Sequence, residues 1–285
     1  MKMRSLVAQL CPPMLANLAT RRKPKPPVPE WFVGFFGRYP TFAQAREKSG
    51  HYDEAGLLDI RAARFDPSLD QWNNSQRLLT AQEVGFTAAL TYCLSRTGSN
   101  PKTILDFGGE FGLHYLMYRK TNPYPCRWFV AELPQAARLG AQKWKGDDQI
   151  TFHTSLEQIP GPLDLALASS SIQYTDSPYE YCRKLEEKGS RFLFIDRLPL
   201  TPEGDDFCSV QRVGPMYYGV AHSLPAWFLS EKKFFAFFAD RWRIVFQYEQ
   251  TKDVAILDDQ PYLNAYRAIL FQRIATAPES PENRR

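Results

Sequence analysis

Residues 103–113 constrain the fold more than any other part of the chain; they read Thr-Ile-Leu-Asp-Phe-Gly-Gly-Glu-Phe-Gly-Leu. A short apolar stretch ends in the carboxylate of Asp106 and passes through a glycine turn into a helix that we expect to begin near Phe111. Glycine permits positive φ angles and a close approach of the backbone to a ligand. The first amides of the following helix have no partner inside the helix and can face that ligand. The pattern indicates a nucleotide-binding corner of an α/β sheet, although a strand–turn–helix without a ligand shares these local features.

The charge of this turn discriminates between nucleotide ligands. A dinucleotide fingerprint, G-x-G-x-x-G, places a pyrophosphate on the helix N-terminus. Here Asp106 stands where the first glycine of that fingerprint would be, and Glu110 lies inside the turn. Both carboxylates would repel a diphosphate and suit a cationic ligand. S-adenosylmethionine (SAM) carries a sulfonium, an ammonium and no phosphate, so we expect SAM as the cofactor, with its methionine portion near Asp106, Gly108, Gly109 and Gly112.

The composition fits one α/β domain with an N-terminal extension. The chain has 285 residues, of which 44% are hydrophobic and 14% aromatic, enough for a full core. A net charge of +4, spread along the chain, gives no reason to expect nucleic acid as a partner. The five cysteines form no C-x-x-C pair, which argues against a disulfide framework or a structural zinc site and predicts no metal. This cysteine usage suits a reducing cytoplasm.

The first thirty residues form a segment of their own. Prolines 12 and 13 interrupt its apolar stretch, which is too short to span a bilayer and a poor match to a signal peptide. We expect a short helix that packs on the domain or on a partner. Weak contact with a membrane surface is a second interpretation, because basic residues 21–25 follow directly. Residues 24–29 are a proline-rich linker, and residues 275–285 are expected to be a disordered tail.

The remaining sequence predicts a helical cap followed by a doubly wound α/β domain. Residues 31–100 are expected to be largely helical. From residue 101 to 274 strand and helix patterns alternate, as in a mostly parallel sheet, with an irregular insertion at 196–224 over the site. The predicted strands are 103–106, 127–132, 150–153, 163–168, 191–195, 242–248 and 267–273.

Candidate ligand-binding residues follow the predicted strands. Glu132 ends the second strand, where its two oxygens can accept hydrogen bonds from both ribose hydroxyls. A carboxylate that caps the helix before Pro134 is the structural alternative. After the third strand, Ser155 and Leu156 are predicted to pass over an adenine ring. The sequence therefore places an adenosine across the ends of these strands.

The ends of the fourth and fifth strands are the expected acceptor region. Ligands sit beyond the carboxyl ends of parallel strands, so Ser170, Gln173 and Tyr174 would face the methyl group and its acceptor. An ordinary capped loop would use similar residues. Asp196 and Arg197 either hold the insertion as an ion pair or contact the acceptor.

The insertion supplies further candidates for acceptor binding and catalysis. Residues 210–228, which include the end of the insertion, are rich in hydrogen-bonding aromatics. The flat apolar faces and polar tips of tyrosine and tryptophan suit a sugar or another flat polar acceptor; Gln211 and Tyr217 are the candidate contacts. His222 can titrate near neutral pH and is the first candidate for a general base, with Tyr174 and Asp196 as further catalytic candidates. A structural histidine is the alternative for His222.

Several segments together resemble one branch of the class I SAM-dependent methyltransferases. They are residues 31–39, 42–45, 49–53, 105–109, 130–134, 170–174 and 195–199. Members of that branch are often associated with bacterial surface-polysaccharide or lipopolysaccharide biosynthesis. The resemblance implies a Rossmann-like α/β fold with a seven-stranded, mostly parallel sheet and an antiparallel last strand. It also implies methyl transfer to an oxygen or nitrogen of a small molecule or glycan precursor. Glu110 departs from the pattern, which has a small residue at that position.

Two other classes of function remain compatible with this sequence. A non-catalytic protein could keep the methyltransferase fold, because class I methyltransferases have no obligatory catalytic residue that could be checked. An NAD-dependent nucleotide-sugar enzyme would share the sheet, but Asp106 and the missing first glycine argue against it. The sequence does not identify the acceptor or the oligomeric state.

Overall fold

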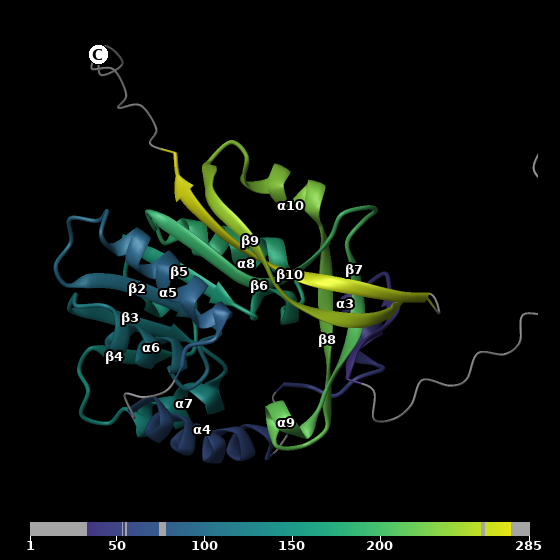
Figure 1. Ribbon diagram of the computed structural model, residues 1–285, viewed down its shortest axis with the longest axis horizontal. Coiled ribbons are helices and arrows are strands. Elements are labelled where there is room, and N and C mark those ends of the chain that lie inside the picture. Colours follow the sequence, from purple (N-terminus) through teal and green to yellow (C-terminus); the bar gives the residue numbers. More distant parts are fainter. Residues whose placement is uncertain (1–32, 53, 55, 74–77, 258–259, 275–285) are drawn as a thin grey trace, which may run out of the picture. The chain divides into compact units, whose positions relative to one another are not determined.

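The computed structural model describes residues 33–52, 54, 56–73, 78–257 and 260–274 (Figure 1). The predictions for the N-terminal segment 1–30 and the tail 275–285 lie outside these residues. No helix in the described ranges is long and apolar enough to cross a membrane.

Seven strands form the predicted Rossmann-like sheet. Five neighbouring strands are parallel: β4 (Ile150–His153), β3 (Cys126–Ala131), β2 (Lys102–Phe107), β5 (Leu165–Ser169) and β6 (Phe192–Thr201). The strand β10 (Gln260–Arg273) then pairs antiparallel with β6, and β9 (Trp242–Leu257) pairs antiparallel with β10. The predicted α/β fold with a mostly parallel sheet and an antiparallel last strand is confirmed.

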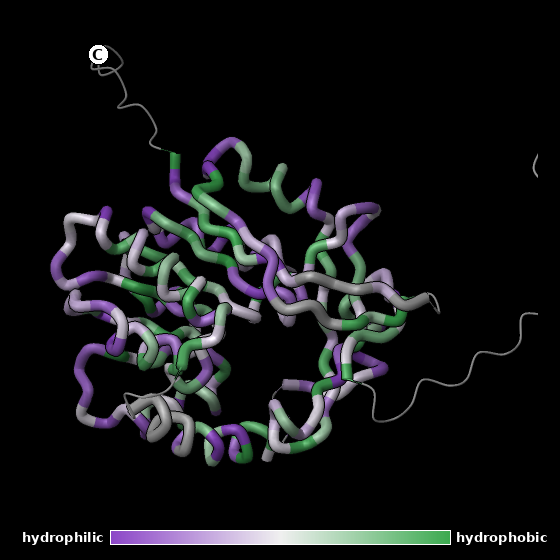
Figure 2. The backbone as a smooth tube through the Cα atoms, in the orientation of Figure 1, coloured by the Kyte–Doolittle hydropathy of each residue, from purple (hydrophilic) through white to green (hydrophobic). Residues whose placement is uncertain are grey.

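Alternate residues of the central strands enter two hydrophobic clusters, one on each face of the sheet. Phe192 and Phe194 pack with α4 (Leu57–Asn73), α5 (Ala81–Leu94), α6 (Leu113–Thr121) and α7 (Pro134–Lys143). Leu193 and Ile195 pack with α8 (Pro178–Glu187) and α10 (Glu231–Phe238). Because both faces are covered, the strands carry apolar residues on both sides and do not simply alternate between apolar and polar residues; Figure 2 shows green segments along them.

The start of α5 shows how local sequence fixes a helix boundary. The Thr80 side chain accepts a hydrogen bond from the backbone of Glu83, and the Glu83 side chain accepts one from the backbone of Thr80. This reciprocal capping box satisfies two amides that the helix itself leaves without partners. Helices α7 and α8 instead begin with Pro134 and Pro178, whose missing N–H groups cost nothing in the first turn.

The predictions for residues 31–39 and for the insertion were wrong in detail. Residues 34–39 form a strand, β1 (Gly34–Tyr39), in a region predicted as helical. The insertion is not irregular: it contains β7 (Phe207–Val213), the short helix α9 (Pro215–Tyr218) and the start of β8 (His222–Ser230). β7 and β8 pair with each other, but each also pairs with a strand farther away in sequence, β7 with β1 and β8 with β6, so periodicity within the segment does not reveal them.

These strands close a six-stranded barrel beside the sheet. Around the ring, β6 pairs with β8, β8 with β7, β7 with β1, β1 with β9, β9 with β10, and β10 again with β6. Figure 1 shows the long β9–β10 hairpin running from the sheet towards β7 and β8. The barrel interior contains Phe228, whose ring centroid lies 4.9 Å from the rings of both Phe207 and Phe35. The ring of strands therefore has its own hydrophobic core.

Replacing the central aromatic of this barrel should destabilise the protein strongly. Phe228 is completely buried. F228A removes its contacts and leaves a cavity, which should lower the free energy of unfolding by about 3–5 kcal/mol in denaturant titrations. Tyr217 on α9 is 67% exposed, so Y217A is the control and should change that free energy by less than about 0.5 kcal/mol. Equal, small effects of both variants would show that the barrel interior is not packed.

Candidate functional site

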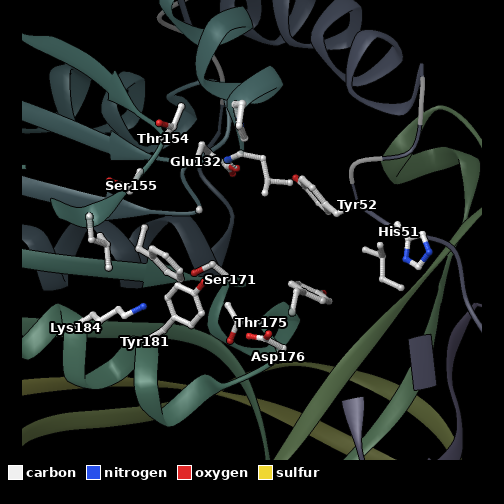
Figure 3. Close-up of a pocket in the computed structure, with 18 of the residues that line it drawn as sticks. His51, Tyr52, Glu132, Thr154, Ser155, Ser171, Thr175, Asp176, Tyr181 and Lys184 are labelled. Carbon is white, nitrogen blue, oxygen red and sulfur yellow. Dashed lines mark hydrogen bonds between the residues drawn. The ribbon is translucent and has the colours of Figure 1, made fainter. Parts of the chain in front are cut away.

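A pocket of about 530 Å³ opens at the carboxyl ends of the parallel strands (Figure 3). Six of the residues predicted from sequence line it: Gly108, Glu132, Ser155, Leu156, Ser170 and Tyr174. The other predicted residues lie outside its lining: Asp106, Gly109, Gly112, Gln173, Asp196, Arg197, Gln211, Tyr217 and His222. The structure therefore brings the adenosine-side candidates together, whereas most candidates for catalysis and acceptor binding lie elsewhere.

A second wall of the pocket comes from the predicted cap region, residues 31–100, and from β8, and none of its residues had been singled out from the sequence. Phe42 and Arg46 belong to α3 (Phe42–Arg46), and His51 and Tyr52 follow it. The strand β8 adds two apolar residues, Leu224 and Pro225. Figure 3 shows His51 and Tyr52 on the side opposite Glu132 and Ser171. The sequence predicted a cap or lid at residues 31–100, and segments 42–45 and 49–53 were among those that carried the resemblance, but no residue of this wall had been given a role.

Close packing explains the glycines of the turn. Gly108 has a φ of +71°, and a Cβ atom there would lie 2.4 Å from the Cβ atom of Ser171. A Cβ atom on Gly109 would lie 2.3 Å from a carboxylate oxygen of Asp106. Neither position has room for a side chain, and at Gly108 the backbone itself lines the pocket.

Glu132 presents its carboxylate at the end of β3. Its Oε1 accepts a hydrogen bond from the backbone N–H of Glu110 at 3.1 Å, and its Oε2 accepts one from that of Leu133 at 2.7 Å. Burial raises the pKa of Glu132 to about 7; the hydrogen bond from Leu133 opposes this shift, and the negative charge of Glu110 adds to it. Each oxygen keeps a lone pair, so the carboxylate can accept two further hydrogen bonds from a ligand.

Glu110, the charged residue within the glycine turn, is held by cationic and hydroxyl groups from the N-terminal extension. Its φ is +50°. Arg61 on α4 donates to both carboxylate oxygens, one bond measuring 2.8 Å, and the Tyr52 hydroxyl donates at 3.2 Å. The Arg61 guanidinium also lies 3.8 Å from the ring centroid of Tyr218 on α9. A large residue is therefore accommodated in the turn because its side chain is bound by α4 and does not line the pocket.

Asp106 lies beneath the turn and pairs with a histidine that no motif had singled out. Its side chain is completely buried, and the Nδ1 atom of His114 lies 3.1 and 3.2 Å from its two oxygens. Burial opposes the charged form of His114, but the charge and hydrogen bond of Asp106 outweigh it, so the pKa of His114 is raised. The only sequence feature that pointed to this pair is its spacing: Asp106 lies at the end of β2, and His114 lies in the first turn of the helix that follows.

The ends of β5 and β6 are joined by buried polar contacts. Asp196 is 1% exposed and accepts hydrogen bonds of 2.7 Å from the Ser169 hydroxyl and from the Gln250 amide. Burial raises its pKa, and the bond from Ser169 opposes that shift. Gln173 donates to the Ser170 hydroxyl at 3.2 Å and to the backbone oxygen of Arg197 at 3.1 Å. These groups therefore hold the two strand ends together.

Backbone strain is concentrated in the same region. Among the described residues, the non-glycine positions with positive φ are Glu110, Ser170 (+53°) and Arg197 (+57°). They lie in the turn after β2, directly after β5, and within β6 where its pairing with β10 shifts register. Such conformations cost about 1–3 kcal/mol each and are found preferentially at functional sites.

The candidates from the insertion take part in contacts between elements. The Tyr174 hydroxyl donates to Gln211 at 2.6 Å, and the Gln211 amide donates to the hydroxyl of Tyr266 at 3.3 Å. The Nε2 atom of His222 lies 3.0 Å from the backbone oxygen of His51. Tyr217 is largely exposed on α9. The structure thus links Tyr174 at the pocket to the barrel interior.

No protein-family model matches this chain, and no curated protein matches it. Its fold is similar to solved structures at low identity. One is Burkholderia thailandensis 1,6-didemethyltoxoflavin-N1-methyltransferase with S-adenosylhomocysteine bound, at 14% identity, 79% coverage of this chain, 99% of that chain and a TM-score of 0.46. Another is the N-terminal domain of EvdMO1 with S-adenosylhomocysteine bound, at 14% identity, 79% coverage of this chain, 98% of that chain and a TM-score of 0.47. A third is a SAM-dependent methyltransferase from Clostridium acetobutylicum, at 8% identity, 74% coverage of this chain, 98% of that chain and a TM-score of 0.45. At these identities and TM-scores the likenesses assign no ligand to this chain.

The raised pKa of Glu132 should make the stability of the ligand-free protein depend on pH. The folded protein holds a proton on Glu132 up to a pKa of about 7, whereas the unfolded chain loses it near 4.5. Stability should therefore fall as pH rises through this window and level off above it. Relative to E132Q, the free energy of unfolding should fall by about 3 kcal/mol between pH 4.5 and pH 8. Parallel curves for the two proteins in denaturant titrations would contradict the assignment.

Proposed function

We propose that this protein is a SAM-dependent methyltransferase that acts on an oxygen or nitrogen of a small polar acceptor. The observation that carries the proposal is the Glu132 carboxylate, fixed by two backbone amides in a pocket beside a glycine turn. A carboxylate at the end of this strand suits a ribose with two hydroxyl groups.

The rest of the pocket fits an adenosine and its methionine extension. Leu133 and Leu156 supply apolar surface beside Glu132, which suits the faces of an adenine ring. The hydroxyl of Ser171 is buried and has no hydrogen-bond partner among the described residues, although Ser171 lines the pocket next to Gly108. A buried hydroxyl without a partner is costly, and a polar ligand atom would satisfy it.

The charge of the site favours SAM over a dinucleotide. Glu132, Glu110 and Asp106 lie close enough together to raise the pKa of Glu132. A pyrophosphate placed in the pocket beside this turn would meet the Glu132 carboxylate. The cations of the pocket lining, Arg46 and Lys184, come from α3 and α8 and not from the turn. We therefore rank an NAD-dependent nucleotide-sugar enzyme below methyl transfer.

Positioning is the main catalytic contribution that these residues can make. SAM supplies a methyl group already activated by a positively charged sulfur. Glu132 and the backbone of Gly108 would fix the cofactor, and the wall formed by His51, Tyr52 and Tyr174 would hold the acceptor in line with the methyl group. Holding two reactants in reactive geometry can contribute about 7–11 kcal/mol to lowering the barrier.

We propose a sugar or glycan precursor as the acceptor. The wall opposite Glu132 combines aromatic rings (Phe42, Tyr52, Tyr174) with hydrogen-bonding groups (Arg46, His51). Flat aromatic faces with polar tips suit sugars. We also propose that the protein acts in the cytoplasm, since the four described cysteines are buried and unpaired. A non-catalytic protein that keeps the fold is the alternative, and it predicts cofactor binding without methyl transfer or no binding.

Calorimetric titration with SAM tests the proposed cofactor. The wild-type protein should bind SAM saturably, and E132A should weaken binding at least about tenfold, because hydrogen bonds to a charged group contribute roughly 1.5–3 kcal/mol each. E157A is the matched control: it removes an exposed carboxylate from the rim of the same pocket and should bind like the wild type. Binding of NAD in place of SAM, or equal loss in both variants, would contradict the proposal.

The affinity for SAM should also depend on pH. Glu132 accepts ribose hydroxyls best when it is ionised, and its pKa in the free protein is about 7. The dissociation constant should therefore be about tenfold higher at pH 6 than at pH 8, following the ionised fraction of Glu132. E132Q should bind more weakly and lose this dependence. A pH-independent affinity in the wild type would show that the ionised carboxylate is not required.

A further inference from the structure

His114 and Asp106 form a carboxylate–imidazole pair at the carboxyl end of β2. The Nδ1 atom of His114 lies 3.1 Å from one oxygen of Asp106 and 3.2 Å from the other. The Asp106 side chain is completely buried, whereas that of His114 is 19% exposed. The His114 ring also stacks on Phe86 of α5, with centroids 4.8 Å apart and planes at 21°. The contact with Asp106 thus fixes the Nδ1 atom of His114, and the stacking on Phe86 fixes the plane of its ring.

The second nitrogen of His114 is left available. No hydrogen bond to Nε2 occurs among the described residues, and this atom is not among their buried polar atoms without partners. A neutral imidazole that donates from Nδ1 to a carboxylate carries its lone pair on Nε2. This is the arrangement in which a buried carboxylate orients a histidine for proton transfer.

The other three histidines of the chain are less suited to this role. His222, the sequence-based candidate, has Nε2 3.0 Å from the His51 backbone oxygen and Nδ1 3.6 Å from Glu54. His51 accepts a hydrogen bond on Nδ1 from Arg46 at 3.1 Å, which leaves its Nε2 protonated when the ring is neutral. His153 ends β4, and its Nε2 contacts the Thr151 hydroxyl at 3.0 Å.

His114 lies next to the proposed cofactor pocket: its partner Asp106 directly precedes Phe107 and Gly108, which line the pocket, while Asp106 and His114 themselves do not. His114 follows the glycine turn by two residues, on the first turn of α6. Its ring is within electrostatic reach of Asp106 on β2 and of Asp196 and Arg197 on β6. The backbone N–H of the pocket residue Ser170 donates to the backbone oxygen of Asp196 at 2.9 Å. The pair therefore lies at the strand ends where the cofactor pocket meets β6.

We propose that the Nε2 atom of His114 is the proton acceptor of the methyl transfer, and that Asp106 is its positioning residue. This rests on the proposed methyltransferase function, and it assigns Asp106 to His114 rather than to the ammonium group of the cofactor. The acceptor oxygen or nitrogen forms the new bond to the methyl carbon as the carbon–sulfur bond breaks, and sulfur keeps that electron pair. His114 takes the proton of the acceptor and becomes an imidazolium beside the Asp106 carboxylate. It later releases the proton to water.

Ring-nitrogen NMR of the full-length, histidine-labelled protein tests the geometry without an acceptor. Only four histidines contribute signals, and H114Q identifies that of His114. Neutral His114 should carry its proton on Nδ1 with Nε2 bare. D106N should shift the population towards the Nε2-protonated tautomer, because an amide can donate to Nδ1. An Nε2-protonated ring in the wild type, or a ring that remains cationic up to pH 10, would overturn the proposal.

Chemical modification tests whether Nε2 faces the cofactor. Diethylpyrocarbonate at pH 8 should acylate His114, and saturating SAM should slow this reaction several-fold in peptides quantified by mass spectrometry. His222 is the internal control and should react slowly with and without SAM, since both of its nitrogens have neighbours. An unreactive His114, or a rate that SAM does not change in a protein that binds SAM, would overturn the assignment.

Calorimetry distinguishes a failure of the His114 proposal from a failure of the proposed methyltransferase function. H114Q should bind SAM within a few-fold of the wild type, because a group that acts on the acceptor contributes little to cofactor affinity. Loss of SAM binding in folded H114Q would make His114 a structural or cofactor-binding residue and overturn its proposed role. If the wild type itself does not bind SAM, the methyltransferase proposal fails, whatever the NMR spectra of His114 show.

Discussion

The hydrogen bond from the backbone of Glu110 to the Glu132 carboxylate connects the two halves of the pocket floor. It ties the glycine turn after β2 to the end of β3. On its other side, Glu110 is bound by Arg61 and Tyr52, so the N-terminal extension is attached to the same turn. The turn is thus fixed from the sheet and from α4 together, and its backbone is held in shape before any ligand arrives. Such preorganisation reduces the ordering cost of binding.

Two of the three carboxylates near the turn have side-chain partners from the chain itself. Asp106 is paired with His114, and Glu110 with Arg61. Glu132 alone of the three is held by backbone amides and also lines the pocket. Burying carboxylates is costly unless they are paired or hydrogen-bonded. The pairing therefore lets an acidic turn exist in a buried place while one carboxylate remains for a ligand.

The barrel supplies the wall opposite the sheet. Strand β8 contributes Leu224 and Pro225 to the pocket, and Gln211 on β7 binds the hydroxyl of Tyr174. Because the barrel shares β6, β9 and β10 with the sheet, its position relative to the strand ends is set by continuous strands rather than by a linker. A wall built in this way can differ in its residues without disturbing the opposite side of the pocket, which under the proposed function suits a role in acceptor specificity.

The sequence alone determined the α/β class and the places of the parallel strands along the chain, and it singled out six of the residues that line the pocket. These depend on local signals: apolar runs, a glycine turn, and Glu132 directly after a strand. The partners of Asp106 and Glu110, the barrel, and the wall containing His51 were decided only by tertiary structure. They join residues from 8 to 173 positions apart in the chain, such as Asp106 with His114 and Gly50 with Ser223. No periodic pattern encodes such pairs, because each depends on which surfaces meet after the chain has folded.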